Sequence, residues 1–124
     1  MVNYRELLCN SKRIVVKVGT STLTYDNGKI NFPRIDKLAM VLSDLENTGH
    51  EVVLVTSGAI GVGVSKLNLG ERPKTIREKQ AVAAVGQCEL MHIYSKFFSE
   101  YGHTVAQILL TRDVVEDELR KKNV

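Results

Sequence analysis

The sequence lacks the features that mark disulfide-stabilised, zinc-binding and membrane proteins. Its two cysteines, Cys9 and Cys88, lie far apart and form neither a Cys-x-x-Cys pair nor a ligand spacing with histidine. They therefore indicate neither a disulfide framework nor a zinc site. No apolar run approaches the roughly 18 residues that cross a bilayer, and Arg5 and Glu6 stand where a secretion signal is apolar. We therefore expect a soluble, cytoplasmic protein with reduced cysteines.

The excess of positive over negative charge is also small. The formal net charge is +3, and the basic residues are scattered apart from a group at 120–122. The charge pattern therefore gives no reason to expect nucleic acid as a partner. With 124 residues, 44% of them hydrophobic and 25% charged, the chain has the size and composition of one folded domain.

The segment 51–63, EVVLVTSGAIGVG, joins an apolar run to a glycine-rich turn. The run 52–55 predicts a parallel strand that is buried on both faces. Ser57 and Gly58 follow it, and the glycines remove side chains where another group must come close. A helix that begins here would direct unpaired backbone N–H groups and its positive dipole end at a ligand. This predicts an anion site, although glycines that serve only close packing explain the segment alone equally well.

Three common glycine motifs are absent from this segment. The spacing is G-x-x-G-x-G, which differs from the dinucleotide-binding G-x-G-x-x-G. Gly58 and Gly63 have the frame of a Walker A loop, but valine and serine follow where that loop has lysine and serine or threonine. A valine two residues before Ser57 excludes the nucleophile elbow G-x-S-x-G of hydrolases.

A second apolar run, 13–18, also predicts a central parallel strand, and Lys17 interrupts it near its carboxyl end. Such a lysine either extends its ammonium past the strand end or points it into a site. Gly19 permits close approach of the backbone, and the hydroxyls and amides of Thr20 and Ser21 can hold oxygen atoms. These neighbours favour a site.

The rest of the sequence alternates helical and extended patterns. We expect a short helical turn in a leader of residues 1–12, a turn at 26–28, an amphipathic helix from 33 to 49, a helix from the glycine turn to about residue 67, a connection at 69–74, a long helix over 75–101, a third strand over 104–110 and a final helix. Gly86 should allow a close crossing of the long helix. Asp113 should cap the final helix, with Glu116 in capping-box position.

This order of elements predicts an α/β protein, a three-layer α/β/α sandwich with a mainly parallel sheet. Ligands of such sheets bind outside the carboxyl ends of the strands. Residues 17–21, 57–61 and 111–113 would gather at that edge. A lysine, glycine-rich amides and hydroxyls suit a phosphate or a carboxylate, and phosphoryl transfer depends mainly on positioning and charge neutralisation.

Four segments together resemble one group of proteins, the glutamate 5-kinases (γ-glutamyl kinases) of the amino acid kinase family. They are IVVKVGTSTLT at 14–24, VVLVTSGAIGVG at 52–63, EKQAVAAVGQ at 78–87 and AQILLTRDV at 106–114. The resemblance implies phosphorylation of the γ-carboxylate of L-glutamate by ATP with Mg²⁺, the first step of proline biosynthesis. It also implies a homo-oligomer and feedback inhibition by proline.

The resemblance also implies roles for individual residues. Lys17 would be catalytic and would contact the nucleotide phosphates together with Gly19 and Thr20. Ser57, with Gly58 and Ala59, would bind the glutamate.

Members of this family are considerably longer than 124 residues. We therefore expect residues 1–124 to be the N-terminal, substrate-side part of an amino acid kinase domain, an inactive fragment without the nucleotide-binding half and the metal ligands. Two alternatives stay open at this stage. One is another carboxylate, carbamate or phosphate kinase of the family, and the other is a non-catalytic module for assembly or anion binding.

Overall fold

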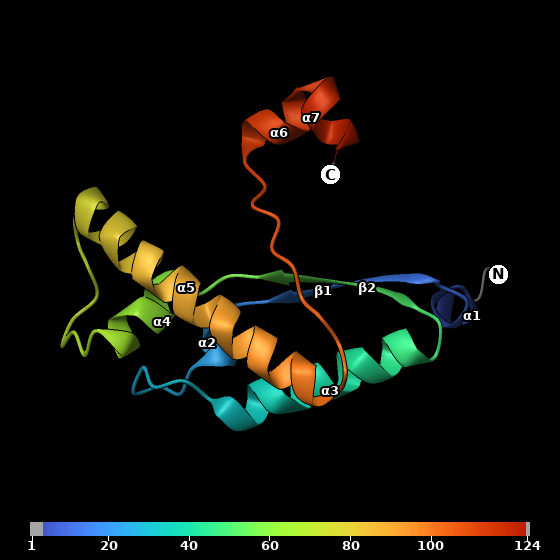
Figure 1. Ribbon diagram of the computed structural model, residues 1–124, viewed down its shortest axis with the longest axis horizontal. Helices are drawn as coiled ribbons and strands as arrows, with labels where there is room; N and C mark the ends of the chain where they lie inside the picture. Colours follow the sequence, from blue (N-terminus) through green and yellow to red (C-terminus); the bar gives the residue numbers. More distant parts are fainter. Residues whose placement is uncertain (1–3, 124) are drawn as a thin grey trace.

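Two apolar segments form a parallel pair at the centre of the fold. The computed structural model describes residues 4–123, apart from the side chain of Leu8. In it, β1 (Arg13–Val18) and β2 (Glu51–Thr56) pair in register from Arg13 opposite Glu51 to Val18 opposite Thr56. Their β-branched residues suit a pleated surface. Helix α3 (Phe32–Asn47) makes the crossover that parallel strands require (Figure 1).

Helix α3 begins one residue before and ends two residues before the predicted bounds of 33 and 49. The Asn31 side chain accepts a hydrogen bond of 3.1 Å from the Arg34 amide, and a proline occupies the first turn. Ile35, Ala39 and Leu42 are buried at helical spacing. The helix is followed by Gly49, whose φ of 94° is readily adopted only by glycine. The predicted amphipathic helix is confirmed.

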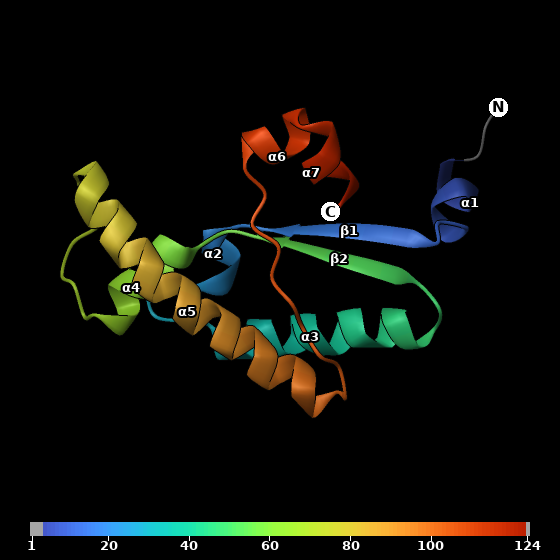
Figure 2. The same cartoon turned by 45° about the horizontal axis from the view of Figure 1, so that its top comes forward.

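The predicted long helix is α5 (Ile76–Glu100). Thr75 and Glu78 form a capping box, in which the Glu78 amide donates to Thr75 Oγ1 at 3.2 Å and the Thr75 amide donates to Glu78 Oε2 at 3.0 Å. Hydrogen bonds from the Thr75 and Lys74 amides lower the pKa of Glu78. Helices α3 and α5 cover the same face of the sheet, and the core lies between them and β1 and β2 (Figure 2). No helix of the described residues is long and apolar enough to span a membrane.

Several smaller predictions are confirmed. Helix α1 (Tyr4–Cys9) lies in the expected leader, whose residues 1–3 are outside the described part. The turn at 26–28 lies between Thr24 and Ile30, which form an antiparallel bridge. Helix α4 (Ala59–Lys66) follows the glycine turn, whereas the four-residue helix α2 (Thr20–Leu23) was not predicted.

The α/β class with a parallel sheet is confirmed, but the prediction that both strands are buried on two faces is wrong for the described residues. Burial alternates along each strand, and the outer face leaves Val15 62% and Val53 and Val55 each 46% exposed. The reason is that α6 (Arg112–Glu116) and α7 (Glu118–Lys122), on that side, stand off the sheet and contain no buried residue (Figure 2).

The predicted third strand over 104–110 is absent from the described sheet, which has two strands. The chain turns at Gly102, where φ is 79°, and then runs away from the sheet as an extended segment (Figure 1). Because this segment has no ladder partner, Ile108, Leu109 and Leu110 are 61–71% exposed. An apolar, β-branched pattern describes a strand only where another strand lies beside it.

The expected cap of the final helix is also wrong. Helix α6 begins after Thr111, so that Asp113 lies in its first turn and pairs with Arg120. Glu116 pairs with Arg112 and forms no capping box. The helical conformation is interrupted at Asp117 between α6 and α7. The Asp117 carboxylate caps α7 by accepting a hydrogen bond of 2.8 Å from the Arg120 amide.

Helices α4 and α5 cross at two glycines with their backbones in contact. A Cβ atom added to Gly86 would lie 1.7 Å from the carbonyl oxygen of Ala59, and one added to Gly63 would lie 2.2 Å from that of Val82. Real side chains cannot occupy such positions, so the crossing requires glycine on both helices. The predicted close crossing at Gly86 is confirmed.

Replacing Gly86 should therefore push the two helices apart. We expect Gly86→Ala to lower the free energy of unfolding by about 1–3 kcal/mol or more, the usual cost of overpacking. The matched control is Gly70→Ala, because a Cβ atom there meets nothing within 4 Å. Urea denaturation followed by circular dichroism measures both variants, and equal midpoints for Gly86→Ala and the unsubstituted chain would contradict the role of the crossing.

Candidate functional site

The carboxyl ends of β1 and β2 place two sequence-predicted segments side by side. The Ser57 amide donates a hydrogen bond of 3.1 Å to the carbonyl oxygen of Val18, and the Ser57 hydroxyl lies 3.4 Å from the same oxygen. Gly19 directly follows Val18. The turn after β1 and the turn after β2 are thus tied together at one edge of the sheet, as expected of parallel strands.

Thr20 packs into the glycine turn after β2. A Cβ atom on Gly58 would lie 3.5 Å from Thr20 Oγ1, and one on Gly61 would lie 2.8 Å from Thr20 Cγ2. Gly58 also has a φ of 120°, which L side chains rarely adopt. These glycines therefore let Thr20 approach, and the structure brings Gly19 and Thr20 together with Ser57, Gly58 and Ala59.

The same turn opens helix α4 without a side-chain cap. Gly58 is the N-cap residue and has no side chain that could accept from the helix amides. The first amides of a helix have no acceptor within it, and the helix dipole makes this end positive. Ala59, Ile60 and Gly61 supply these amides and are all partly accessible. An anion with several oxygen atoms fits such an end.

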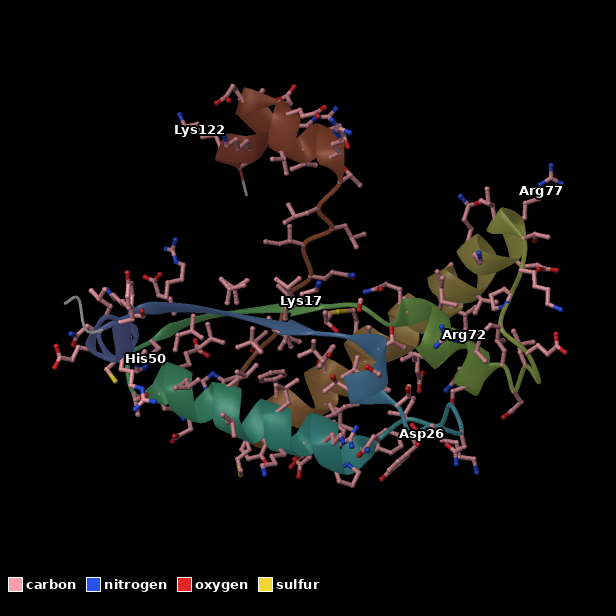
Figure 3. All side chains as sticks on the ribbon, turned by 180° about the vertical axis from the view of Figure 1, so that it is seen from behind. Lys17, Asp26, His50, Arg72, Arg77 and Lys122 are labelled. Carbon is pink, nitrogen blue, oxygen red and sulfur yellow. The ribbon has the colours of Figure 1, made fainter. Side chains whose placement is uncertain are left out.

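Lys17 lies on the outer face of the sheet. It pairs in register with Val55, so that both side chains point away from α3 and α5, and it is exposed (Figure 3). The structure shows no ion pair of its ammonium with any described residue. The lysine thus provides an uncompensated positive charge two residues before Gly19.

The third predicted group of site residues, 111–113, does not reach the edge formed by the carboxyl ends of β1 and β2. Thr111, Arg112 and Asp113 belong to the start of α6, which stands away from the sheet (Figure 1). The physical reason is the missing third strand, because only a strand paired with β1 or β2 would carry these residues to the common edge.

The structure reveals two residues of this region that sequence reasoning missed. Tyr94 of α5 is 3% exposed, and its hydroxyl lies 2.8 Å from Thr56 Oγ1 at the end of β2. Loss of solvent around the phenol raises the pKa of Tyr94, although the Thr56 hydrogen bond acts in the opposite sense. A tyrosine within an apolar helical stripe is a signal for such a contact, because a buried hydroxyl requires a partner.

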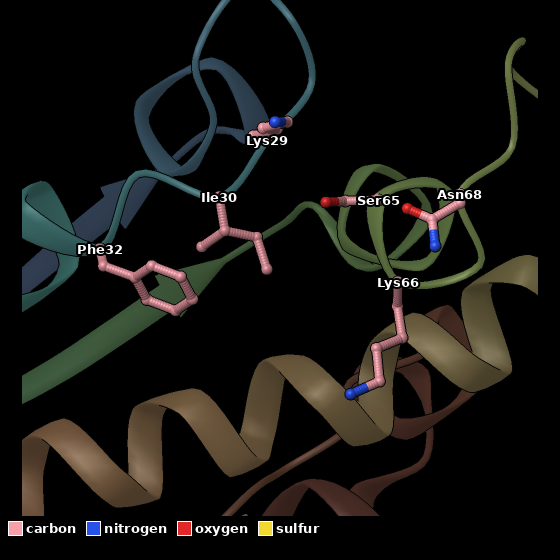
Figure 4. A pocket seen from close by; sticks show the side chains of 6 residues that line it. All are labelled: Lys29, Ile30, Phe32, Ser65, Lys66 and Asn68. Carbon is pink, nitrogen blue, oxygen red and sulfur yellow. The ribbon is translucent and has the colours of Figure 1, made fainter.

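Two shallow cavities lie elsewhere on the described surface. One, of about 370 Å³, lies between the turn after α2 and the end of α4 (Figure 4); its lining residues are Lys29, Ile30, Phe32, Ser65, Lys66 and Asn68. The Lys66 ammonium pairs with Glu89 at 3.0 Å, so its charge is compensated. The other, of about 560 Å³, lies under the loop from Leu67 to Lys74. Neither cavity contains a predicted site residue.

The described residues contain no group of three histidine, cysteine, aspartate or glutamate side chains that could hold a metal ion. A magnesium ion held mainly by carboxylates of this part of the chain is therefore not supported. The chemistry that the edge itself offers is recognition of an anion by one ammonium group, backbone amides and hydroxyls.

The chain is similar to known proteins over nearly its whole length. The model of the amino acid kinase family matches residues 12–124. A protein of Clostridium perfringens named glutamate 5-kinase is 71% identical over 120 residues, which cover 97% of this chain and 45% of that protein. Proteins of the same name from Listeria innocua and Enterococcus faecalis are 67% and 61% identical over 120 residues, and the chain covers 44% of each. The chain therefore spans less than half the length of these relatives. Because the family match extends over nearly all of its residues, the chain belongs to the amino acid kinase family.

Proposed function

We propose that this chain forms the substrate-side part of an enzyme that transfers a phosphoryl group from ATP to the γ-carboxylate of L-glutamate. The observation that carries the proposal is the joining of Gly19 and Thr20 to the turn at Ser57 and Gly58, beside the uncompensated charge of Lys17. The relatives named glutamate 5-kinase supply the identity of the acceptor and the reaction.

The proposed roles are those that the family resemblance implies for each group. The Ser57 hydroxyl and the amides of Gly58 and Ala59 bind the glutamate carboxylate at the positive end of α4. In this proposal the Gly19 amide and the Thr20 hydroxyl contact the phosphates of ATP. Lys17 neutralises charge on the transferring phosphoryl group, which is the main catalytic need in such a reaction.

The bond changes are those of a phosphoryl transfer. A γ-carboxylate oxygen of glutamate attacks the γ-phosphorus of ATP, the bond from that phosphorus to the bridging oxygen breaks, and ADP leaves. The products are glutamyl 5-phosphate and ADP. The described residues do not fit a magnesium site, so we assign no step of this reaction to a metal held by them.

We also propose a cytoplasmic location and a homo-oligomer. Cys9 and Cys88 are unpaired and exposed, which suits a reducing compartment. Exposed apolar side chains on the outer sheet face and on the segment 108–110 support association with a second copy. Feedback inhibition by proline stays a prediction of the family resemblance.

Lys17 can be tested in a chimera in which this chain replaces the matching 120 residues of the Clostridium perfringens relative. Lys17→Ala should lower turnover by about 100-fold or more, since the loss of one group that stabilises the transition state has this magnitude. The melting temperature should not change, because the side chain is exposed. Lys29→Ala is the matched control, since Lys29 is an exposed lysine at the distant cavity. Normal turnover in Lys17→Ala would remove Lys17 from the site.

Ser57 can be tested in the same chimera by steady-state kinetics. Ser57→Ala should raise the KM for glutamate by about 13-fold to 160-fold, the value of one lost hydrogen bond to a charged group, and leave the KM for ATP unchanged. Ser65→Ala, which removes a hydroxyl beside the distant cavity, should change neither constant. An unchanged KM for glutamate in Ser57→Ala would contradict its place in the substrate site.

A further inference from the structure

A chain of two hydroxyls connects the long helix α5 to the turn that opens α4. The hydroxyl of Tyr94 lies 2.8 Å from Thr56 Oγ1, and Thr56 Oγ1 lies 3.3 Å from the carbonyl oxygen of Ser57. Thr56 is the last residue of β2 and lies on the face toward α5. The two contacts therefore link the buried Tyr94 to Ser57, the first residue of the turn between β2 and α4.

The direction of these hydrogen bonds follows from the number of protons. A threonine hydroxyl has one proton, and Thr56 donates it to the carbonyl oxygen of Ser57. Tyr94 must then donate to Thr56 Oγ1. A phenol is protonated at neutral pH, and burial raises the pKa of Tyr94 further, so Tyr94 remains a donor.

The hydroxyl chain fixes a peptide plane. The Ser57–Gly58 peptide is trans, because the described residues contain no cis peptide bond. In a trans peptide the N–H points opposite to the C=O, so holding the Ser57 carbonyl toward Thr56 directs the Gly58 N–H the other way. The preceding peptide is fixed independently, by the hydrogen bond from the Ser57 amide to Val18.

The turn has few other restraints on this peptide. Gly58 has no side chain, and as a glycine it has the widest choice of backbone angles. We propose that Tyr94 is a positioning residue, which acts through Thr56 to hold the Gly58 N–H in the direction of the glutamate carboxylate. This inference rests on the proposed function and adds a residue of α5 to the determinants of glutamate affinity.

The proposal explains why this position carries a tyrosine. The ring of Tyr94 packs against Phe98, with a distance of 6.3 Å between ring centroids, and a phenylalanine would keep that packing. Tyr94→Phe thus removes the hydroxyl alone. The matched control is Tyr101→Phe, because the Tyr101 hydroxyl donates to Asp36 Oδ1 at 2.9 Å, remote from the glycine turn.

The first test is the kinetics of these variants in the chimera described above. Tyr94→Phe should raise the KM for glutamate by about 2-fold to 13-fold, since one restraining hydrogen bond is lost, with a smaller change in kcat and none in the KM for ATP. Tyr101→Phe should leave the KM for glutamate unchanged. Equal effects of the two substitutions on the KM for glutamate would overturn the proposal.

Variants of Thr56 separate positioning from general stability. Thr56→Val removes the hydroxyl and should raise the KM for glutamate as Tyr94→Phe does. Thr56→Ser keeps the hydroxyl and should leave the KM for glutamate at the value of the unsubstituted chimera. The double variant Tyr94→Phe/Thr56→Val should be no worse than either single variant, because both break the same hydrogen-bond chain. Additive losses would overturn the proposal.

A second measurement needs no ligand and separates this inference from the proposed function. In the 124-residue chain, nuclear magnetic resonance gives the chemical shift of the Gly58 amide without any ligand. Tyr94→Phe should shift this signal, because the Ser57–Gly58 peptide loses the hydrogen-bond chain that orients it, whereas Tyr101→Phe should not. An unchanged Gly58 amide in Tyr94→Phe overturns the inference, whereas an unsubstituted chimera that does not phosphorylate glutamate overturns the proposed function.

Discussion

The backbone contact between α4 and α5 is the constraint on which the rest of the site depends. Ala59, the first residue of α4, has its carbonyl oxygen where a Cβ atom of residue 86 would be, so only glycine there lets α5 lie directly against that first turn. Close-packed interiors do not deform to admit an extra methyl group without cost. The crossing therefore fixes the start of α4, and with it the direction in which its free amides point.

The glycines around this turn serve two different needs. Gly63 and Gly86 are explained by helix packing, because each would place a Cβ atom against the backbone of the other helix. Gly58 and Gly61 instead leave room for Thr20 of the neighbouring turn, and Gly58 also adopts a backbone angle that suits glycine. Gly63 and Gly86 thus serve helix packing, and the proposed anion site depends on Gly58 and Gly61.

Local signals in the sequence predicted most of the helices and strands, but not the contacts behind the candidate site. The apolar runs and the helical spacing of apolar residues located β1, β2, α3 and α5, because each of these patterns lies within its own segment. The segment 104–110 has the pattern of a strand but no partner, and pairing depends on what lies beside it. The hydrogen bond between Thr56 and Tyr94 joins residues 38 positions apart, so the tyrosine in an apolar stripe indicates that its hydroxyl has a partner but does not identify Thr56 as that partner.

The most direct test of the account is a crystal structure of the chimera with L-glutamate bound. The account predicts a carboxylate of glutamate within hydrogen-bonding distance of the Ser57 hydroxyl and the amides of Gly58 and Ala59, with the Tyr94 and Thr56 hydroxyls still joined behind the turn. Glutamate bound in another place, such as the cavity lined by Lys29 and Asn68, with the first turn of α4 free of ligand, would contradict it.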